Sequence, residues 1–131
     1  MARYLSEEWF DEVNRAAAAS ERLRSDAAGV RLVIQQVVTG GPGGDDIRWL
    51  VRVQNGVVTV APGDDPAADV TMTEEWDTAV RVASGDLSPA AAFMTGRIRV
   101  SGNVGVLLDA QGSLRELEPV FAGVRKATTF A

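Results

Sequence analysis

The clearest hydrophobic pattern in the chain is a pair of alternating apolar and polar runs, residues 47–54 and 57–61, joined by Asn55-Gly56. Asn-Gly is the strongest short-range signal for a two-residue β-hairpin turn. Such a turn fixes the register and places Val51 opposite Val60. One face of the predicted hairpin is then wholly apolar, formed by Trp49, Val51, Val53, Val58 and Val60.

Three other segments, residues 30–39, 69–73 and 97–101, are rich in β-branched residues or alternate between apolar and polar positions. These properties predict strands. The Gly/Pro-rich stretch 39–46 predicts a hairpin loop, and residues 61–69 predict a turn. Together with the hairpin, the chain is expected to form five strands.

Helical spacing of apolar residues predicts the remaining elements. The first helix is expected over residues 7–24 with Ser6 as its N-cap, and the second is expected to start at Glu74-Glu75 with Thr73 as its cap. A short helix is expected over residues 89–95, with Ser88 as its N-cap and Pro89 at its first position. Another helix is expected to start near Val104. The final helix is expected after a break at Gly112, opened by a capping box of Ser113 and Glu116.

This order of elements predicts an α+β fold over residues 1–131 as a single domain. Its core would be a five-stranded, mainly antiparallel sheet covered on one face by helices. The three glycines in FMTGRIRVSGNVG, at positions 96, 102 and 105, raise the question of a phosphate-binding loop. They lack the third glycine of a dinucleotide fingerprint, so a tight corner between strand and helix is the better interpretation.

Composition narrows the possible chemistry. The chain has a net charge of −5, with no histidine and no cysteine. The negative charge disfavours nucleic acid and anionic membranes as partners. Lack of histidine and cysteine removes the usual nucleophile arrangements, disulfides, and common zinc and haem sites. No apolar run is long enough to span a membrane, so a cytoplasmic protein without stable membrane insertion is expected.

Residues 69–108 carry a further pattern. An aspartate-containing strand and the helix TEEW are followed by the turn GDLSP, the helix end AFMTG, an alternating basic strand and the corner GNVG. In this combination the segment resembles the sterol carrier protein 2 family of lipid-binding domains, in its stand-alone bacterial form. Arg97 and Arg99 stand where family strands usually carry lysine, and the segment after Asp109 differs from the ending of peroxisomal members.

The resemblance implies a non-catalytic carrier with an apolar tunnel between sheet and helices, needing no metal or cofactor. The implied ligand is a fatty acid, acyl-CoA, phospholipid or sterol-like lipid. Arg97 and Arg99 would bind the lipid headgroup or the phosphate of a CoA ligand, or would only form a solvent-exposed face of the sheet. The candidate lining residues, each of which could instead only fill the core, are Met72, Trp76, Val80, Phe93, Met94, Ile98, Val100, Val104, Leu107 and Leu108.

Two other classes of function stay open at this point. One is a ligand-free interaction or dimerisation module serving a lipid-metabolising enzyme, with Trp9, Phe10, Phe121 and Phe130 at the contact. The other is a small enzyme of the ketosteroid-isomerase-like cone fold. The enzyme is disfavoured because no carboxylate is expected within an apolar strand face.

Overall fold

The computed structural model describes residues 2–130, without the side chains of residues 111–115. Its helices are α1 (Glu7–Ala19), α2 (Glu21–Asp26), α3 (Trp76–Ala83), α4 (Pro89–Met94), α5 (Val104–Asp109) and α6 (Gln111–Arg125). Its strands are β1 (Ala2–Arg3), β2 (Arg31–Thr39), β3 (Ile47–Gln54), β4 (Val57–Pro62), β5 (Val70–Glu75), β6 (Ile98–Gly102) and β7 (Thr128–Thr129).

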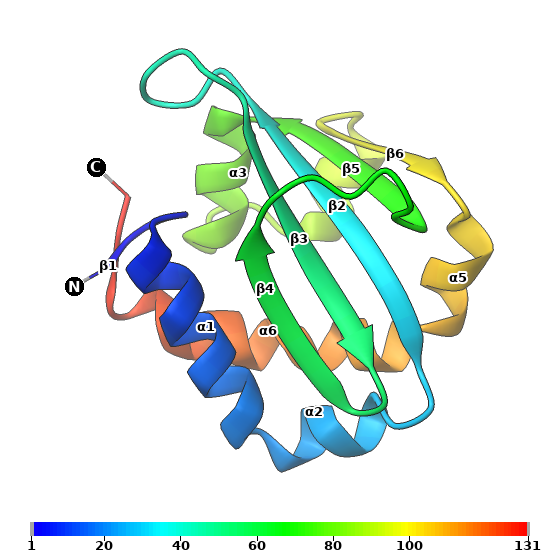
Figure 1. The fold of residues 1–131 in the computed structure, drawn as a ribbon. Coiled ribbons are helices and arrows are strands. Elements are labelled where there is room, and N and C mark those ends of the chain that lie inside the picture. Colours follow the sequence, from blue (N-terminus) through cyan, green and yellow to red (C-terminus); the bar gives the residue numbers. More distant parts are fainter. Residues whose placement is uncertain (1, 131) are drawn as a thin grey trace.

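Five of these strands form one sheet in the order β4-β3-β2-β5-β6. β2 and β5 pair in parallel, and the other neighbours are antiparallel. The long helices α1 and α6 lie together on one side of the sheet, while the β4–β5 connection crosses its other face (Figure 1). The predicted α+β class and mainly antiparallel sheet are confirmed.

The hairpin of β3 and β4 has the predicted register, with Val51 opposite Val60 and Gln54 opposite Val57. Asn55 and Gly56 both adopt positive φ, at 49° and 85°. This is the combination that a type I′ turn requires. The five apolar side chains assigned to the inner face are all buried. The residues of the turn and the burial of the apolar face therefore agree on the same register of β3 and β4.

The first helix differs from its prediction because it breaks at Ser20. This residue is extended, with ψ 106°, and its hydroxyl accepts a hydrogen bond from the Leu23 backbone N–H at 3.2 Å. The serine therefore starts a second helix, α2, as an N-cap. The N-cap predicted at Ser6 is confirmed, since its hydroxyl accepts from the Trp9 N–H at 3.2 Å.

The second correction concerns the strand predicted to end at Thr73. β5 continues to Glu75 because Glu74 is paired with Val38 on one side and Ile98 on the other. α3 starts only at Trp76, so Thr73 is not its cap. Pairing on both sides of the strand satisfies the backbone groups that the predicted helix turn would have used. As a result, a carboxylate occupies a central strand.

The last helix also differs from its prediction. α6 starts at Gln111, directly after Ala110, and continues through Gly112 and Ser113. The break expected at Gly112 and the capping box expected at Ser113 are therefore wrong. A glycine inside a helix costs about 1 kcal/mol. Packing of the helix outweighs that cost, since Leu117, Val120 and Val124 are buried in the core.

Two polar side chains hold the layers together. Asn14 on α1 donates to the Val60 carbonyl at 2.9 Å and accepts from the Val60 N–H at 2.7 Å, so it completes the hydrogen bonding of the edge strand β4. On the opposite face Gln35, only 3% exposed, donates to the Gly63 carbonyl at 3.1 Å and accepts from the Asp65 N–H at 2.8 Å. It anchors the β4–β5 connection across the sheet.

Candidate functional site

The predicted lining residues come from β5, α3, α4, β6 and α5. β5 pairs with β6, α3 contacts β5 and α4, and α4 contacts β6, whereas α5 follows β6 and contacts α6. Antiparallel pairing of β5 with β6 places Met72 opposite Val100. The residues that pack against the main core while staying partly exposed are Met72, Trp76, Val80, Val100 and Leu107. Ile98 is also half-buried. These are six of the ten predicted residues, and five of the six pack against the main core.

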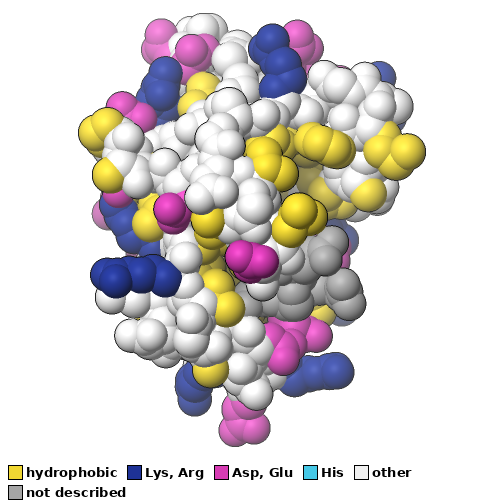
Figure 2. Space-filling view, turned by 90° about the vertical axis from the view of Figure 1, so that its right-hand side faces the viewer, with side chains coloured by type: hydrophobic (Ala, Val, Ile, Leu, Met, Phe, Trp, Pro, Cys, Tyr) yellow, Lys and Arg dark blue, Asp and Glu magenta, His cyan; other side chains and the backbone are white. Residues whose placement is uncertain are grey.

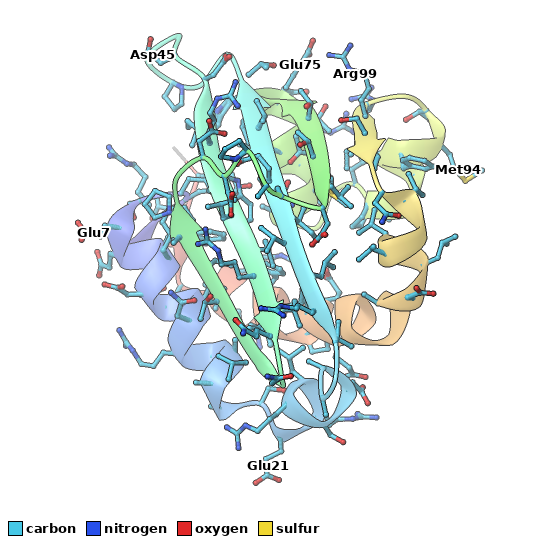
Figure 3. All side chains as sticks on the ribbon, turned by 45° about the vertical axis from the view of Figure 1, so that its right-hand side comes forward. Glu7, Glu21, Asp45, Glu75, Met94 and Arg99 are labelled. Atoms are coloured by element: carbon cyan, nitrogen blue, oxygen red, sulfur yellow. The ribbon has the colours of Figure 1, made fainter. Side chains whose placement is uncertain are left out.

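The other predicted residues form an exposed apolar surface. Phe93 is 57% exposed, Met94 84%, Val104 48% and Leu108 62%. Apolar side chains gather on the molecular face that carries α4 and α5 (Figure 2), and Met94 points away from the body of the protein (Figure 3). We call Phe93, Met94, Val104 and Leu108 the α4–α5 surface. Clustered apolar exposure of this kind marks binding sites in soluble proteins.

The corner between β6 and α5 is shaped by close backbone approach. Gly102 has φ 102°, and a Cβ at this position would lie 2.6 Å from the Asp69 carbonyl oxygen. The Asn103 N–H donates to that same carbonyl at 2.8 Å. Asp69 in turn accepts from the Val33 N–H at 2.8 Å through Oδ2. Glycine is therefore required for the tight turn from β6 into α5. The helix α5 has six residues and exposes Val104 and Leu108 to solvent.

Arg97 and Arg99 both lie on the exposed side of this region, as their alternation with Ile98 predicts. Arg99 projects from the end of the sheet (Figure 3). Ser88 caps α4 by accepting from the Ala91 N–H at 3.1 Å, and Pro89 occupies the first helical position. The short helix is therefore held at its start. Arg99 pairs with Thr73 and so points to the face of the sheet opposite that of Ile98 and Val100.

The aromatic residues considered for a protein contact lie elsewhere. Trp9 and Phe10 are each 4% exposed, and Phe121 and Phe130 are partly buried against the same core. Trp9 packs edge-on against Trp49 with ring centroids 5.7 Å apart. These rings join α1, the sheet and the chain ends. Trp9 and Phe10 are therefore too buried to form the contact surface that the interaction-module alternative assigned to them.

Among the residues with described placement, the carboxylates form no group of three or more that could hold a metal ion. Asp64 lies 3.4 Å from Arg48, and Asp65 lies 3.3 Å from Arg52, both as exposed ion pairs. Pairs of this kind contribute at most about 1 kcal/mol. Within the described residues, no helix is long and apolar enough to cross a membrane.

Glu74 was predicted to lie in the first turn of a helix, but it lies in β5 on the helix-covered face of the sheet. It shares its strand face with Val70 and Met72, and its Oε2 atom is buried with no hydrogen-bond partner among the described residues. Burial raises the pKa of Glu74 to about 7. Burial, together with the nearby Glu74 charge, also raises the pKa of Tyr4. The expectation that no carboxylate lies within an apolar strand face is therefore wrong.

A hollow of about 380 Å³ lies beside this carboxylate, between the chain ends, α3 and the β2–β3 loop. Of the predicted ligand-binding residues, only Trp76 is among the described residues that line it. Sequence reasoning missed the hollow because its walls come from segments far apart in the chain. The sequence features that could have indicated it are the aromatic residues Tyr4 and Phe130, which stand near the two ends of the sequence.

Residues 10–115 match the model of the SCP-2 sterol transfer family. The chain belongs to this family. Sterol carrier protein 2 of Bos taurus is 35% identical over 74 residues, which cover 56% of this chain and 14% of that protein. The chain therefore spans a small part of the length of the curated relatives that it matches.

Solved structures share the fold. A conserved protein of Thermus thermophilus, described as a candidate sterol carrier protein, superposes with a TM-score of 0.77 at 20% identity, covering 95% of this chain and 91% of that chain. The palmitated protein SCP2L2 of Aedes aegypti superposes with a TM-score of 0.64 at 20% identity, covering 83% of this chain and 95% of that chain. The family resemblance drawn from residues 69–108 is thus confirmed.

Proposed function

We propose that the protein, acting as one domain, is a non-catalytic carrier of an apolar ligand: a fatty acid, acyl-CoA, phospholipid or sterol-like lipid. The observation that carries the proposal is the α4–α5 surface, where four large apolar side chains remain exposed next to a half-buried apolar layer. Family membership supports a lipid ligand, and the palmitated relative from Aedes aegypti supports a fatty acid within that class.

The ligand's apolar part would lie between the half-buried layer of Met72, Trp76 and Val100 and the exposed side chains of α4 and α5. Closure of α4 and α5 over it would complete the tunnel. Burial of a methylene group contributes about 0.8 kcal/mol, so a sixteen-carbon chain offers roughly 10 kcal/mol before the cost of association. That magnitude supports micromolar or tighter binding without any catalytic group.

Arg97 and Arg99 would meet the polar end of the ligand. Both are exposed; Arg99 lies on β6, and Arg97 lies between the end of α4 and the start of β6. Guanidinium groups bind carboxylates and phosphates through paired hydrogen bonds, so either arginine suits a fatty acid or a phosphorylated headgroup.

Titration with a fluorescent fatty acid tests the proposed site. Met94→Gln and Leu108→Gln together remove apolar contact from side chains that are 84% and 62% exposed, so the fold should tolerate them. We expect the pair to weaken binding about tenfold, as loss of about 1.4 kcal/mol implies. Val57→Gln is the matched control, because Val57 is 60% exposed at the far edge of the sheet. Equal affinity of all three proteins would contradict the assigned site.

A further inference from the structure

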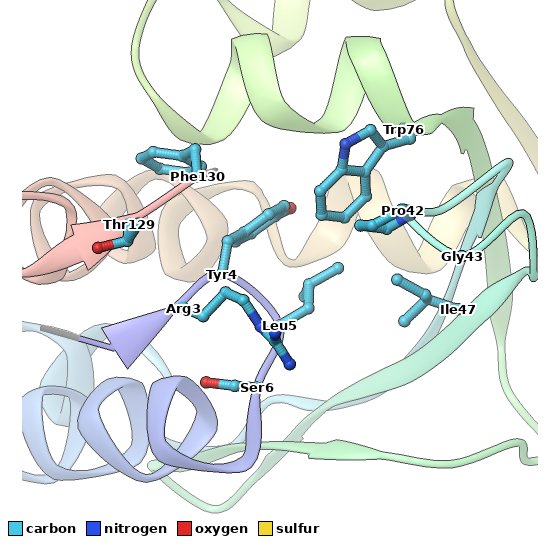
Figure 4. A pocket seen from close by; sticks show the side chains of 10 residues that line it. All are labelled: Arg3, Tyr4, Leu5, Ser6, Pro42, Gly43, Ile47, Trp76, Thr129 and Phe130. Atoms are coloured by element: carbon cyan, nitrogen blue, oxygen red, sulfur yellow. The ribbon is translucent and has the colours of Figure 1, made fainter.

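The hollow between the two chain ends lies outside the α4–α5 surface. β1 pairs in parallel with β7, which brings Tyr4 and Phe130 together, and the β2–β3 loop closes the other side. Figure 4 shows the side chains around it. Apart from Trp76, these residues do not belong to the proposed carrier site. The described residues that line the hollow are Arg3, Tyr4, Leu5, Ser6, Pro42, Gly43, Ile47, Trp76, Thr129 and Phe130.

Most of the wall is aromatic or aliphatic. The Tyr4 ring lies 5.6 Å from the Trp76 ring and 5.3 Å from the Phe130 ring, measured between centroids. Pro42 and Ile47 face these rings from the β2–β3 side (Figure 4). Ring faces pack favourably against planar apolar groups, with about 0.5–1.5 kcal/mol per aromatic pair beyond area burial. The volume of about 380 Å³ lies within the range of small-molecule sites.

A strained residue forms part of this wall. Leu5 has φ 62°, a left-handed conformation that costs a side-chain-bearing residue about 1–2 kcal/mol. Hydrogen bonds on either side maintain it: the Tyr4 N–H donates to the Thr129 carbonyl at 2.8 Å, and the Ser6 N–H donates to the Arg3 carbonyl at 3.0 Å. Strain of this kind concentrates at ligand-binding sites, where the surrounding structure imposes it.

The charges around the hollow differ between its two ends. Arg3 is the only charged residue among the described residues that line it. The Tyr4 hydroxyl points toward Trp76, away from Arg3 (Figure 4), and the Glu74 carboxylate raises the pKa of that hydroxyl in addition to the larger effect of burial. Arg3 therefore attracts an anionic group to its end of the hollow, while the described lining residues at the Trp76 end carry no charge. Glu7, Glu8 and Asp11 line an adjoining groove together with Arg3 and Arg15.

We propose that this hollow binds a small carboxylate with a compact, ring-bearing apolar body. The ring would pack against the exposed parts of Trp76 and Phe130, which flank the buried Tyr4, and the carboxylate would pair with the Arg3 guanidinium. A guanidinium group pairs with a carboxylate through two parallel hydrogen bonds. Ser6 supplies a hydroxyl beside Arg3.

Isothermal titration calorimetry with 2-naphthoate and 2-naphthylmethylammonium tests the proposal, because the two probes share a ring system and differ in charge. We expect naphthoate to bind at least about tenfold more tightly than the ammonium compound. Arg3→Gln should weaken naphthoate binding about tenfold. Arg15→Gln is the matched control, since Arg15 lines the adjoining groove and not the hollow, and it should bind as the unaltered protein does.

The Met94→Gln, Leu108→Gln protein separates this proposal from the carrier function. It should retain full naphthoate binding, whether or not its fatty acid binding is impaired. Three results would overturn the proposal: no heat of binding for naphthoate at millimolar concentration, equal or tighter binding of the ammonium probe, or an equal loss in the Arg3→Gln and Arg15→Gln proteins. Circular dichroism of each variant verifies that the exposed substitutions leave the fold intact.

Discussion

The buried carboxylate of Glu74 should make the stability of the protein depend on pH in an unusual direction. Burial raises its pKa from an ordinary 4.5 to about 7 in the folded protein. The folded state therefore holds this proton more tightly than the unfolded state. The stabilisation that comes from this tighter proton binding is complete below about pH 4.5 and is lost as the pH rises toward 7. Glu74→Gln, which resembles the protonated form, removes this loss.

The magnitude follows from the two pKa values. Their difference, from 4.5 to about 7, corresponds to about 3 kcal/mol at 1.36 kcal/mol per pH unit. Glu74 is only partly buried, so solvent screening reduces the expected effect to about 1–2 kcal/mol. We therefore expect Glu74→Gln to be more stable than the unaltered protein by about 1–2 kcal/mol at pH 8, and nearly equal to it at pH 4.5.

Urea unfolding at several pH values, followed by tryptophan fluorescence, measures this difference. Other carboxylates contribute equally to both proteins and cancel in the comparison. Glu75→Gln is the control, because Glu75 is the next residue of β5 and is exposed. A constant difference between the Glu74→Gln and unaltered proteins from pH 4.5 to pH 8 would refute the reasoning, as would the same pH-dependent gain in Glu75→Gln.

Further predictions concern the elements that position the site. Gly102→Ala should lower the free energy of unfolding by about 2 kcal/mol or more, because the residue has φ 102° and the added Cβ would lie 2.6 Å from the Asp69 carbonyl oxygen. Gly96→Ala is the comparison: Gly96 has φ 75°, but no atom lies within 4 Å of the added Cβ, so the loss should be about 1 kcal/mol. Equal losses in urea unfolding would argue against the close approach to Asp69. Asn14→Ala removes both hydrogen bonds to Val60 and should cost about 2 kcal/mol, accompanied by faster amide exchange in β4. Unchanged exchange at Val60 would show that α1 does not secure this edge.

Local patterns predicted the parts of the fold that depend on neighbouring residues. The β3–β4 hairpin followed from Asn55-Gly56, because a two-residue turn permits one register, and from the apolar face that this register creates. Ser6 and Ser88 were identified as caps for a similar reason, since each acts on a backbone N–H three residues away. These features need no information from the rest of the chain.

The errors arose where distant segments decide the structure. Glu74 looked like the first turn of a helix, but pairing with β2 and β6 keeps it in a strand. The break at Ser20 was missed because apolar spacing continues across it. The hollow beside Tyr4 depends on the pairing of two-residue strands at opposite ends of the chain, β1 and β7, which leave no periodic signal.

The candidate lining residues were taken from the motif in residues 69–108, and their contact with a ligand stays a prediction. Met72 and Val100 share an apolar layer because β5 and β6 are antiparallel neighbours. The exposure of Phe93 and Met94 could not be predicted, since it depends on how α4 lies over the sheet. Their contact with a lipid remains a prediction.

Native purification followed by extraction with organic solvent and mass spectrometry tests the central claim most directly. If the protein is a lipid carrier, the extract should contain a fatty acid or other lipid in nearly stoichiometric amount. The Met94→Gln, Leu108→Gln protein should yield clearly less, and the Val57→Gln control should yield as much as the unaltered protein. An extract without lipid, together with no displacement of a bound fluorescent fatty acid, would contradict the account.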